Sequence, residues 1–373
     1  MLKKVIIMIS FLFIVFSLSM CKNIFSAISE PVPVADQYRI YLPRTGLTKC
    51  YKEDGATGEI SCTGSRQDGE IQAGAELPVP RFIDNGNGTM TDRLTGLMWE
   101  KLPDNSAHTW VNAFGRIAAL NSQKLGGYSD WRLPNVLELK SIINYAHNFP
   151  AQWLKDQGFE TIILTSASNY WSSTTTPSDS GQAYYAIFYS NSGGQIKPIT
   201  KTNSYYVIAV RGRGHSGAIR LPRTGQASSI QTGDDGQIQA GAPLPHPRFI
   251  DNGNGTMTDR LTGLMWEKMP YNGTLQWAAA LNHCRTLTTG GYSDWRLPNV
   301  HELISLVNYG YSGSQSAWLI SQGFSGIQTG RHWTSNTELY STNSARYLAF
   351  SDVEFAGNGK TNLYYVLAVR GGK

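Results

Sequence analysis

Side chains that could bind a metal ion recur in two identical segments of the chain. Pro80–Lys101 reads PRFIDNGNGTMTDRLTGLMWEK, and Pro247–Lys268 repeats it residue for residue. Carboxylate and amide oxygens suit Ca²⁺, which takes about 6–8 of them. The candidate ligands are Asp84, Asn85, Asn87 and Asp92, with the copies Asp251, Asn252, Asn254 and Asp259. The glycines at 86 and 88 break the EF-hand spacing, and tight-turn chemistry explains Asn and Gly equally well. These residues are therefore either a Ca²⁺ site or simply a tight turn, and we expect no other cofactor.

Two further residue types could serve recognition. Arg132 and Arg296 could bind an anionic sugar, but we expect them to pair with Asp130 and Asp294 in the same blocks. The ten tryptophans fall at matched places in the two halves and could stack on sugar rings. Because tryptophan mostly contributes buried area, we expect them to fill the cores.

Cysteine usage indicates an oxidising compartment. Cys50 and Cys62 lie in a stretch that the second half lacks, and two glycines between them suggest a hairpin closed by a disulfide. Zinc binding is the alternative, but no further Cys or His ligands accompany this pair. Cys284 matches Ile117 on an apolar helix face, so we expect a buried free thiol.

Catalytic patterns shared by both halves are absent from the sequence. None of the seven histidines has a matched histidine in the other half, and the chain has no P-loop, HExxH, CxxC or Ser/His/Asp set. We therefore expect a protein that is not an enzyme.

The chain is a tandem duplication. Gly126–Val136 reads GGYSDWRLPNV and returns as Gly290–Val300, and the matched blocks follow the same order in both halves. This repeat is longer than a solenoid unit of about 20–50 residues. We expect two domains, 38–213 and 217–373, joined at a glycine-rich stretch.

Local signals predict the elements of each domain. Asn-Gly pairs between β-prone runs indicate hairpins, and Trp110 and Trp277 begin amphipathic patterns typical of a helix. A second helix follows each Leu-Pro, where an Asn and a Glu form a capping-box-like pair. These pairs are Asn135 with Glu138 and Asn299 with Glu302. Short strands at 184–189 and 205–210 complete the first domain. Strands, two helices and further strands predict an α+β fold.

The N-terminal segment has the features of an export signal. Two lysines precede the almost wholly apolar Val5–Met20, which is short for a membrane span of about 20 residues. We expect a signal peptide at 1–29, or a lipoprotein signal at 1–20 with Cys21 lipidated. The protein would then reach the periplasm, outer membrane or cell surface, and it would touch a membrane only through that lipid.

Net charge argues against nucleic acid as a partner. The full chain has 32 basic and 27 acidic residues, a formal charge of +5. Three of the lysines fall in the signal, so the chain from Glu30 carries 29 basic and 27 acidic residues, or +2. A global basic field is therefore absent.

The repeated blocks resemble the family named after the C-terminal domain of the Legionella collagen-like protein. The blocks that carry this resemblance are FIDNGNGTMTDRLTGLMW, GGYSDWRLPNVxEL and the closing YYVxAVRG. The resemblance covers nearly all of both halves. Its best-known member is a surface adhesin whose terminal domain engages sulfated glycosaminoglycans, on a collagen-like stalk that this chain lacks. The WRLPN-x-x-EL segment is also similar to the formylglycine-generating, sulfatase-modifying fold, which implies two tandem C-type-lectin-like domains.

These observations predict an exported binding or adhesion protein whose partner is an extracellular glycan or other polymer. The alternative is a structural envelope component that binds an envelope protein. A formylglycine-generating-like oxidase is a third hypothesis, but such chemistry uses paired active-site cysteines and Cys284 is alone in its half.

Overall fold

The computed structural model describes residues 39–166, 168–188, 194–212, 214 and 216–372. The predicted signal peptide at 1–29, its lipoprotein alternative at 1–20, Cys21 and the domain limits at 38, 213 and 373 lie outside these residues. The described residues belong to one compact unit. None of the helices among them combines the length and the apolar character needed to cross a membrane.

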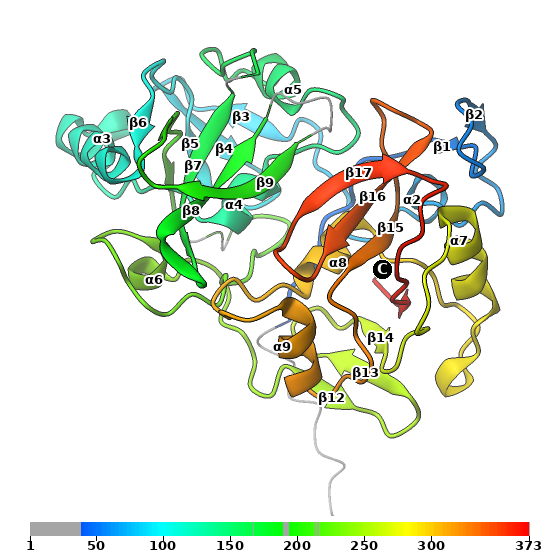
Figure 1. Ribbon diagram of the computed structural model, residues 1–373. Helices are drawn as coiled ribbons and strands as arrows, with labels where there is room; N and C mark the ends of the chain where they lie inside the picture. The colour runs from blue at the N-terminus through cyan, green and yellow to red at the C-terminus, as the bar shows by residue number, and fades with distance from the viewer. Residues whose placement is uncertain (1–38, 167, 189–193, 213, 215, 373) are drawn as a thin grey trace, which may run out of the picture. The chain divides into compact units, whose positions relative to one another are not determined.

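Each repeat contains a four-stranded antiparallel sheet built from the duplicated segment (Figure 1). In the first repeat its order is β11-β5-β4-β3, and in the second β18-β14-β13-β12. The strands are β3 (Phe82–Asp84), β4 (Thr89–Asp92), β5 (Met98–Glu100), β11 (Val210–Arg211), β12 (Phe249–Asp251), β13 (Thr256–Asp259), β14 (Met265–Glu267) and β18 (Val369–Arg370). Gly86 and Gly88 have φ of +72° and +83°, so the Asn-Gly pairs do form the predicted hairpin turn.

A three-stranded antiparallel sheet follows in each repeat. Its strands are β7 (Asn169–Thr176), β8 (Asp179–Ile187) and β9 (Gln195–Thr200), then β15 (Arg331–Thr337), β16 (Ser344–Ala349) and β17 (Phe355–Gly359). The strand expected at 184–189 thus begins earlier and ends at Ile187.

The strand expected at 205–210 is wrong, because this segment crosses between two sheets. β10 (Ser204–Tyr205) pairs with β6 (His108–Thr109), and the chain next joins a sheet at β11. Between them the Ala209 amide donates to the Glu100 carboxylate at 3.1 Å instead of to a neighbouring strand.

The helices are short. They are α3 (Trp110–Gln123), α4 (Val136–Ser141), α5 (Pro150–Asp156), α7 (Trp277–Thr286), α8 (Val300–Ser305) and α9 (Gln315–Ser321), with 3₁₀ turns η1 (Leu125–Gly127) and η2 (Thr289–Gly291). Both predicted capping boxes are confirmed: Asn135 with Glu138 begins α4, and Asn299 with Glu302 begins α8. Antiparallel sheets and short helices make this an α+β architecture.

The ten tryptophans are buried, at most 7% exposed, which confirms their predicted place in the cores. One cluster of buried side chains runs through both repeats, from Phe82 and Trp99 to Phe249 and Trp266. Tyr184 meets Tyr309 edge to face across the two repeats, with ring centroids 5.2 Å apart. The repeats therefore share one continuous apolar core.

The segment before each four-stranded sheet adds small elements. These are β1 (Cys50–Tyr51), β2 (Glu59–Ile60) and α2 (Asp68–Ile71) before the first sheet, and α6 (Asp235–Ile238) before the second. The Pro43–Ala75 bridge closes the first segment on itself, and the Pro222–Ala242 bridge closes the second.

Candidate functional site

The tip of the duplicated hairpin is exposed in both repeats, and part of the predicted metal set lies there. Asp84 accepts a hydrogen bond from Lys101 Nζ at 2.8 Å, which lowers the pKa of its carboxyl. Asn87 Nδ2 donates to the Gly126 carbonyl at 3.2 Å, and Asn87 Oδ1 accepts from Thr89. These contacts tie the hairpin tip to the GGYSD loop.

Asp92 lies at the other end of its strand and does not join Asp84 and Asn87. It is fully buried, takes two hydrogen bonds from Arg81 at 3.0 and 3.1 Å, and accepts another from Thr95. The second repeat repeats both arrangements, with Asp259 on Arg248 and Asp251 on Lys268, while Asn254 accepts from Thr256. Within the described residues, no cluster of three or more His, Cys, Asp or Glu side chains could hold a metal ion.

The GGYSD loop carries a surface cluster of three side chains, in which the aspartate is exposed and the tyrosine and arginine are half-buried. The Arg211 guanidinium lies 3.5 Å from the Tyr128 ring centroid and donates to both oxygens of Asp130, at 2.7 and 3.2 Å. In the second repeat Arg370 lies over Tyr292 at 3.7 Å and donates to Asp294 at 2.6 and 3.2 Å.

We call the exposed hairpin tip and this cluster the shared surface, because both repeats carry it unchanged. Its residues are Asp84–Asn87, Tyr128–Asp130 and Arg211, with Asp251–Asn254, Tyr292–Asp294 and Arg370. The sequence showed the blocks but not that Arg211 reaches Asp130 from 81 positions away.

The pairing predicted for Arg132 and Arg296 is wrong. Arg132 donates to both oxygens of Glu138, at 2.6 and 2.5 Å, and Arg296 does the same to Glu302. The reason is that Arg132 points inward to the helix start, whereas Asp130 faces solvent and is taken by Arg211. Glu138 thus caps its helix and neutralises a buried guanidinium, so Arg132 is a structural residue.

One buried position differs sharply between the repeats. Arg116 binds Glu100 through two hydrogen bonds, one of 2.7 Å, and both side chains are buried. The matching residues are Glu267 and His283. Glu267 Oε2 and His283 Nε2 are buried, and neither has a hydrogen-bond partner in the described part of the chain. Burial raises the pKa of Glu267 to about 7.

Cys284 follows His283 on α7 and is fully buried, as predicted. Burial raises the pKa of its thiol, so the thiolate needed for nucleophilic chemistry is disfavoured. The sequence contains a signal for this difference, because aligning the two repeats places His283 at the position of Arg116. The sequence analysis missed it because it compared histidines only with histidines.

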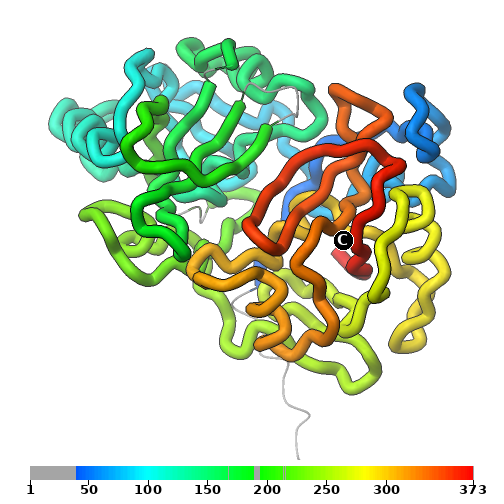
Figure 2. The backbone as a smooth tube through the Cα atoms, viewed as in Figure 1, coloured from blue at the N-terminus to red at the C-terminus, as the bar shows by residue number. Residues whose placement is uncertain are grey.

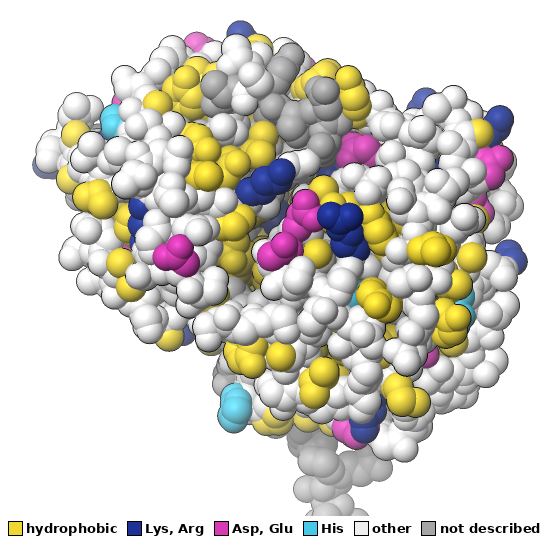
Figure 3. Space-filling view, in the orientation of Figure 1, with side chains coloured by type: hydrophobic (Ala, Val, Ile, Leu, Met, Phe, Trp, Pro, Cys, Tyr) yellow, Lys and Arg dark blue, Asp and Glu magenta, His cyan; other side chains and the backbone are white. Residues whose placement is uncertain are grey.

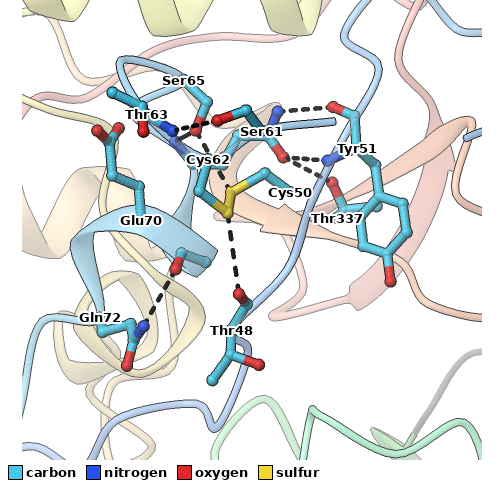
Figure 4. Close-up of a disulfide and its surroundings, with 12 residues drawn as sticks. Thr48, Cys50, Tyr51, Ser61, Cys62, Thr63, Ser65, Glu70, Gln72 and Thr337 are labelled. Carbon is cyan, nitrogen blue, oxygen red and sulfur yellow. Dashed lines mark hydrogen bonds between the residues drawn. A yellow bond between two sulfur atoms is a disulfide. The ribbon is translucent and has the colours of Figure 1, made fainter. Parts of the chain in front are cut away.

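The predicted disulfide is confirmed. Cys50 and Cys62 are joined at the base of the β1–β2 hairpin, with Cα atoms 5.1 Å apart. Ser65 Oγ donates to Cys50 Sγ at 3.4 Å, and the Thr48 carbonyl lies 3.8 Å from Cys62 Sγ (Figure 4). The disulfide fixes a segment that only the first repeat has.

A cleft lies where the turn between β7 and β8 meets the second repeat. It has a volume of about 220 Å³ and is lined by Thr175, Thr176, Pro177, Ser180 and 225–228, with Ile230, Gly310 and Ser312, so its lining is mixed polar and apolar. On the face seen in Figure 3, acidic and basic side chains lie intermixed. This face therefore shows no extended field of one sign that would attract a polyanion by charge alone.

Comparison with known proteins identifies the repeats. The sequence model of the Lcl C-terminal domain family matches residues 88–211 and 255–370, which together exceed half of the chain. No curated protein matches the chain. The family match and the disulfide indicate an exported protein with domains of an extracellular type. The chain belongs to the Lcl C-terminal domain family and carries two tandem copies of that domain.

Proposed function

We propose that this protein is a non-enzymatic binding or adhesion protein of the periplasm, outer membrane or cell surface. Its two modules, which we take to be C-type-lectin-like, recognise a glycan or another extracellular polymer through the shared surface. The observation that carries this proposal is that a surface Tyr–Arg–Asp cluster, with an exposed aspartate, stands unchanged in both repeats, whereas the buried pair Glu100–Arg116 corresponds to Glu267 and His283 in the second repeat.

Packing does not require the aspartate of this cluster, although the tyrosine packs partly against the core. The Asp130 and Asp294 side chains are 60% and 58% exposed, and surface substitutions away from special features usually cost little stability. Each arginine presents N–H donors beside an aromatic ring and a carboxylate, a set that can hydrogen-bond sugar hydroxyls or exchange the carboxylate for a sulfate. Two copies in one chain give avidity when both engage one polymer.

The buried titratable groups support a role without catalysis. Glu100 is held by Arg116 in the first repeat, whereas in the second repeat its counterpart is Glu267 and the counterpart of the arginine is His283. An activity common to both repeats would need the same groups in both. The raised pKa of the buried Cys284 thiol also disfavours an oxidase that relies on a reactive cysteine.

Heparin-column retention and glycan-array binding of the full chain test the proposal. We expect retention at low salt that falls in Arg211→Ala and in Arg370→Ala, and that is lost in the double variant. Arg331→Ala is the matched control. Arg331 is an exposed arginine 4.8 Å from the Tyr347 ring and 3.2 Å from Glu354, but the first repeat has Asn169 at its position.

Two outcomes would contradict the proposal. One is a wild-type chain that binds no polymer at low salt. The other is an Arg331→Ala variant that loses as much binding as the double variant, since charge alone would then explain the retention. A fixed envelope-protein partner without polymer binding would instead favour the structural alternative.

A further inference from the structure

The segment before each duplicated sheet does not pack only against its own repeat. We call residues 39–77 the first arm and 218–245 the second arm, and we call 78–212 the first core and 246–372 the second core. Both arms carry LPRTG and then DG-x-IQAGA, although the disulfide hairpin separates these motifs in the first arm alone.

The second arm packs on the first core. Its short helix α6 lies against β7, as Figure 1 also shows. Thr174 Oγ1 donates to Asp235 Oδ2 at 2.8 Å, and Asn135 Nδ2 lies 3.4 Å from the Ala240 carbonyl it faces. At the start of the arm, the Ile219 amide donates to the Leu94 carbonyl at 2.9 Å.

The first arm packs on the second core in the same way. α2 lies against β15, and Asn336 Nδ2 donates to Asp68 Oδ2 at 3.0 Å. Asn299 Nδ2 donates to the Ala73 carbonyl at 3.1 Å, and the Ile40 amide donates to the Leu261 carbonyl at 2.8 Å. Figure 2 shows this blue arm beside the yellow and red segments of the second repeat.

Asn336 and Thr174 occupy matched positions and make the same two hydrogen bonds, one with an amide side chain and the other with a hydroxyl. Each donates to the arm aspartate, and each also accepts a hydrogen bond from the first amide of the helix in its own core, Val300 or Val136. The position that contacts the arm is therefore built into the core and is not an incidental surface contact.

We propose that each core carries a segment-recognition site, the arm slot, whose ligand is the Asp-Gly turn of the other repeat's arm. The first slot consists of Asn135 and Thr174, and the second of Asn299 and Asn336. The two repeats then complete each other, and the protein acts as one cross-braced unit instead of two independent domains on a linker.

Burial of its carboxylate selects this ligand, and close packing inside the arm shapes the turn that presents it. Asp68 and Asp235 are 1% and 2% exposed, and each also accepts a hydrogen bond from a threonine of its own arm, Thr45 or Thr224. A buried carboxylate without such donors would be costly. A Cβ on Gly69 would stand 2.2 Å from the Lys49 carbonyl oxygen, and one on Gly236 would stand 2.1 Å from that of Ser228. Lys49 and Ser228 belong to the same arms as these glycines, so the fold of each arm itself requires glycine after the aspartate.

A cleavable full chain tests the slot. Val79 is 90% exposed, so a protease recognition sequence inserted after it would separate the first arm from its own core. After cleavage we expect the arm to stay with the body in size-exclusion chromatography and native mass spectrometry. Asn336→Ala should speed its release about 10- to 100-fold, because a buried carboxylate loses a charged hydrogen bond.

The two repeats supply the controls. Thr174→Ala removes the matched donor from the first core and should leave release of the first arm unchanged. Asn336→Thr copies the first core and should restore retention. Immediate loss of the arm from the cleaved wild-type chain would overturn the proposal, and so would release caused by Thr174→Ala but not by Asn336→Ala.

A double-mutant cycle in the uncleaved chain keeps the proposal testable if a cleaved variant unfolds. Urea unfolding should show coupling between Asp68→Asn and Asn336→Ala, and none between Asp68→Asn and Thr174→Ala. Asp235→Asn should show the reverse. Equal coupling of Asp68 to both partners would refute exchange of the arms.

Discussion

The two repeats have the same Tyr–Arg–Asp cluster at the surface, but a buried glutamate that both contain has different partners in each. Glu100 is paired with Arg116, whereas the matching residues of the second repeat are Glu267 and His283, and neither Glu267 Oε2 nor His283 Nε2 has a hydrogen-bond partner in the described residues. The same scaffold can thus hold an internal ion pair in one copy and do without it in the other. The difference separates what holds each repeat together from what the repeats present in common to solvent.

The largest expected effect comes from removing the arginine in the first repeat. Arg116→Ala leaves Glu100 buried without its cation, which should lower the free energy of unfolding by about 3–5 kcal/mol. His283→Ala removes no hydrogen bond of the ring's Nε2 and should cost far less. Urea unfolding of both variants measures the contrast, and equal losses would mean that the two sites are not different in kind.

The disulfide gives the next largest effect, and it concerns the arms. Cys50→Ser with Cys62→Ser opens a loop with a sequence separation of 12 and should cost about 3 kcal/mol or less. The second arm has no such loop and still packs on the first core. We therefore expect the reduced chain to remain folded at lower stability, as followed by urea unfolding with and without reductant. Global unfolding on reduction at room temperature would contradict this expectation.

The pH dependence of stability should contain a contribution from Glu267 in the second repeat, which a comparison with Glu267→Gln separates from those of the buried Asp68 and Asp235, whose pKa values are also raised. The folded-state pKa of Glu267, about 7, lies above its usual value, so its contribution is present at acidic pH and is lost as pH rises through 7. Thr289 donates to this carboxylate, and the Cys284 thiol of α7 interacts with it electrostatically. Between pH 5.5 and 8.5 the wild-type chain should lose on the order of 2 kcal/mol relative to Glu267→Gln.

His283→Arg tests the same comparison, because it gives the second repeat the arginine that the first repeat has at this position. The guanidinium should pair with Glu267, lower its pKa and remove the loss of stability that the wild-type chain shows as pH rises from 4.5 to about 7. Burial lowers the pKa of His283, and this effect has the opposite sign, because stability then falls as pH drops. Glu267→Gln retains that histidine and so isolates the carboxylate. A wild-type profile that matches Glu267→Gln would show that Glu267 does not titrate in this range.

Local chemistry made much of the fold predictable. The capping pairs at Asn135 and Asn299, the Asn-Gly hairpins and the short disulfide loop each depend on residues within about a dozen positions. The tryptophans were predicted to be buried from their size alone. Such features need no knowledge of where distant segments lie.

The rest depends on contacts between distant segments. Asp130 meets Arg211, and Asp68 meets Asn336 across 268 positions, so neither partner can be read from spacing. Arg132 and Glu138 are close in sequence, but the prediction failed because it gave the glutamate only a capping role. Exchange of the arms was equally hidden, since the repeat pattern fits packing within or between repeats.

The smallest expected effect tests whether the shared surface is free of a structural role. Asp130→Ala and Asp294→Ala each remove an exposed partner of a surface arginine, and such pairs contribute about 0–1 kcal/mol. The two losses of unfolding free energy should be small and equal, because the clusters have the same residues and nearly the same distances. A loss above about 2 kcal/mol in either variant would show that stability requires the cluster. Stability alone would then explain why both repeats contain the same cluster, and no ligand would be needed. Small losses combined with weaker polymer retention would place its role in binding.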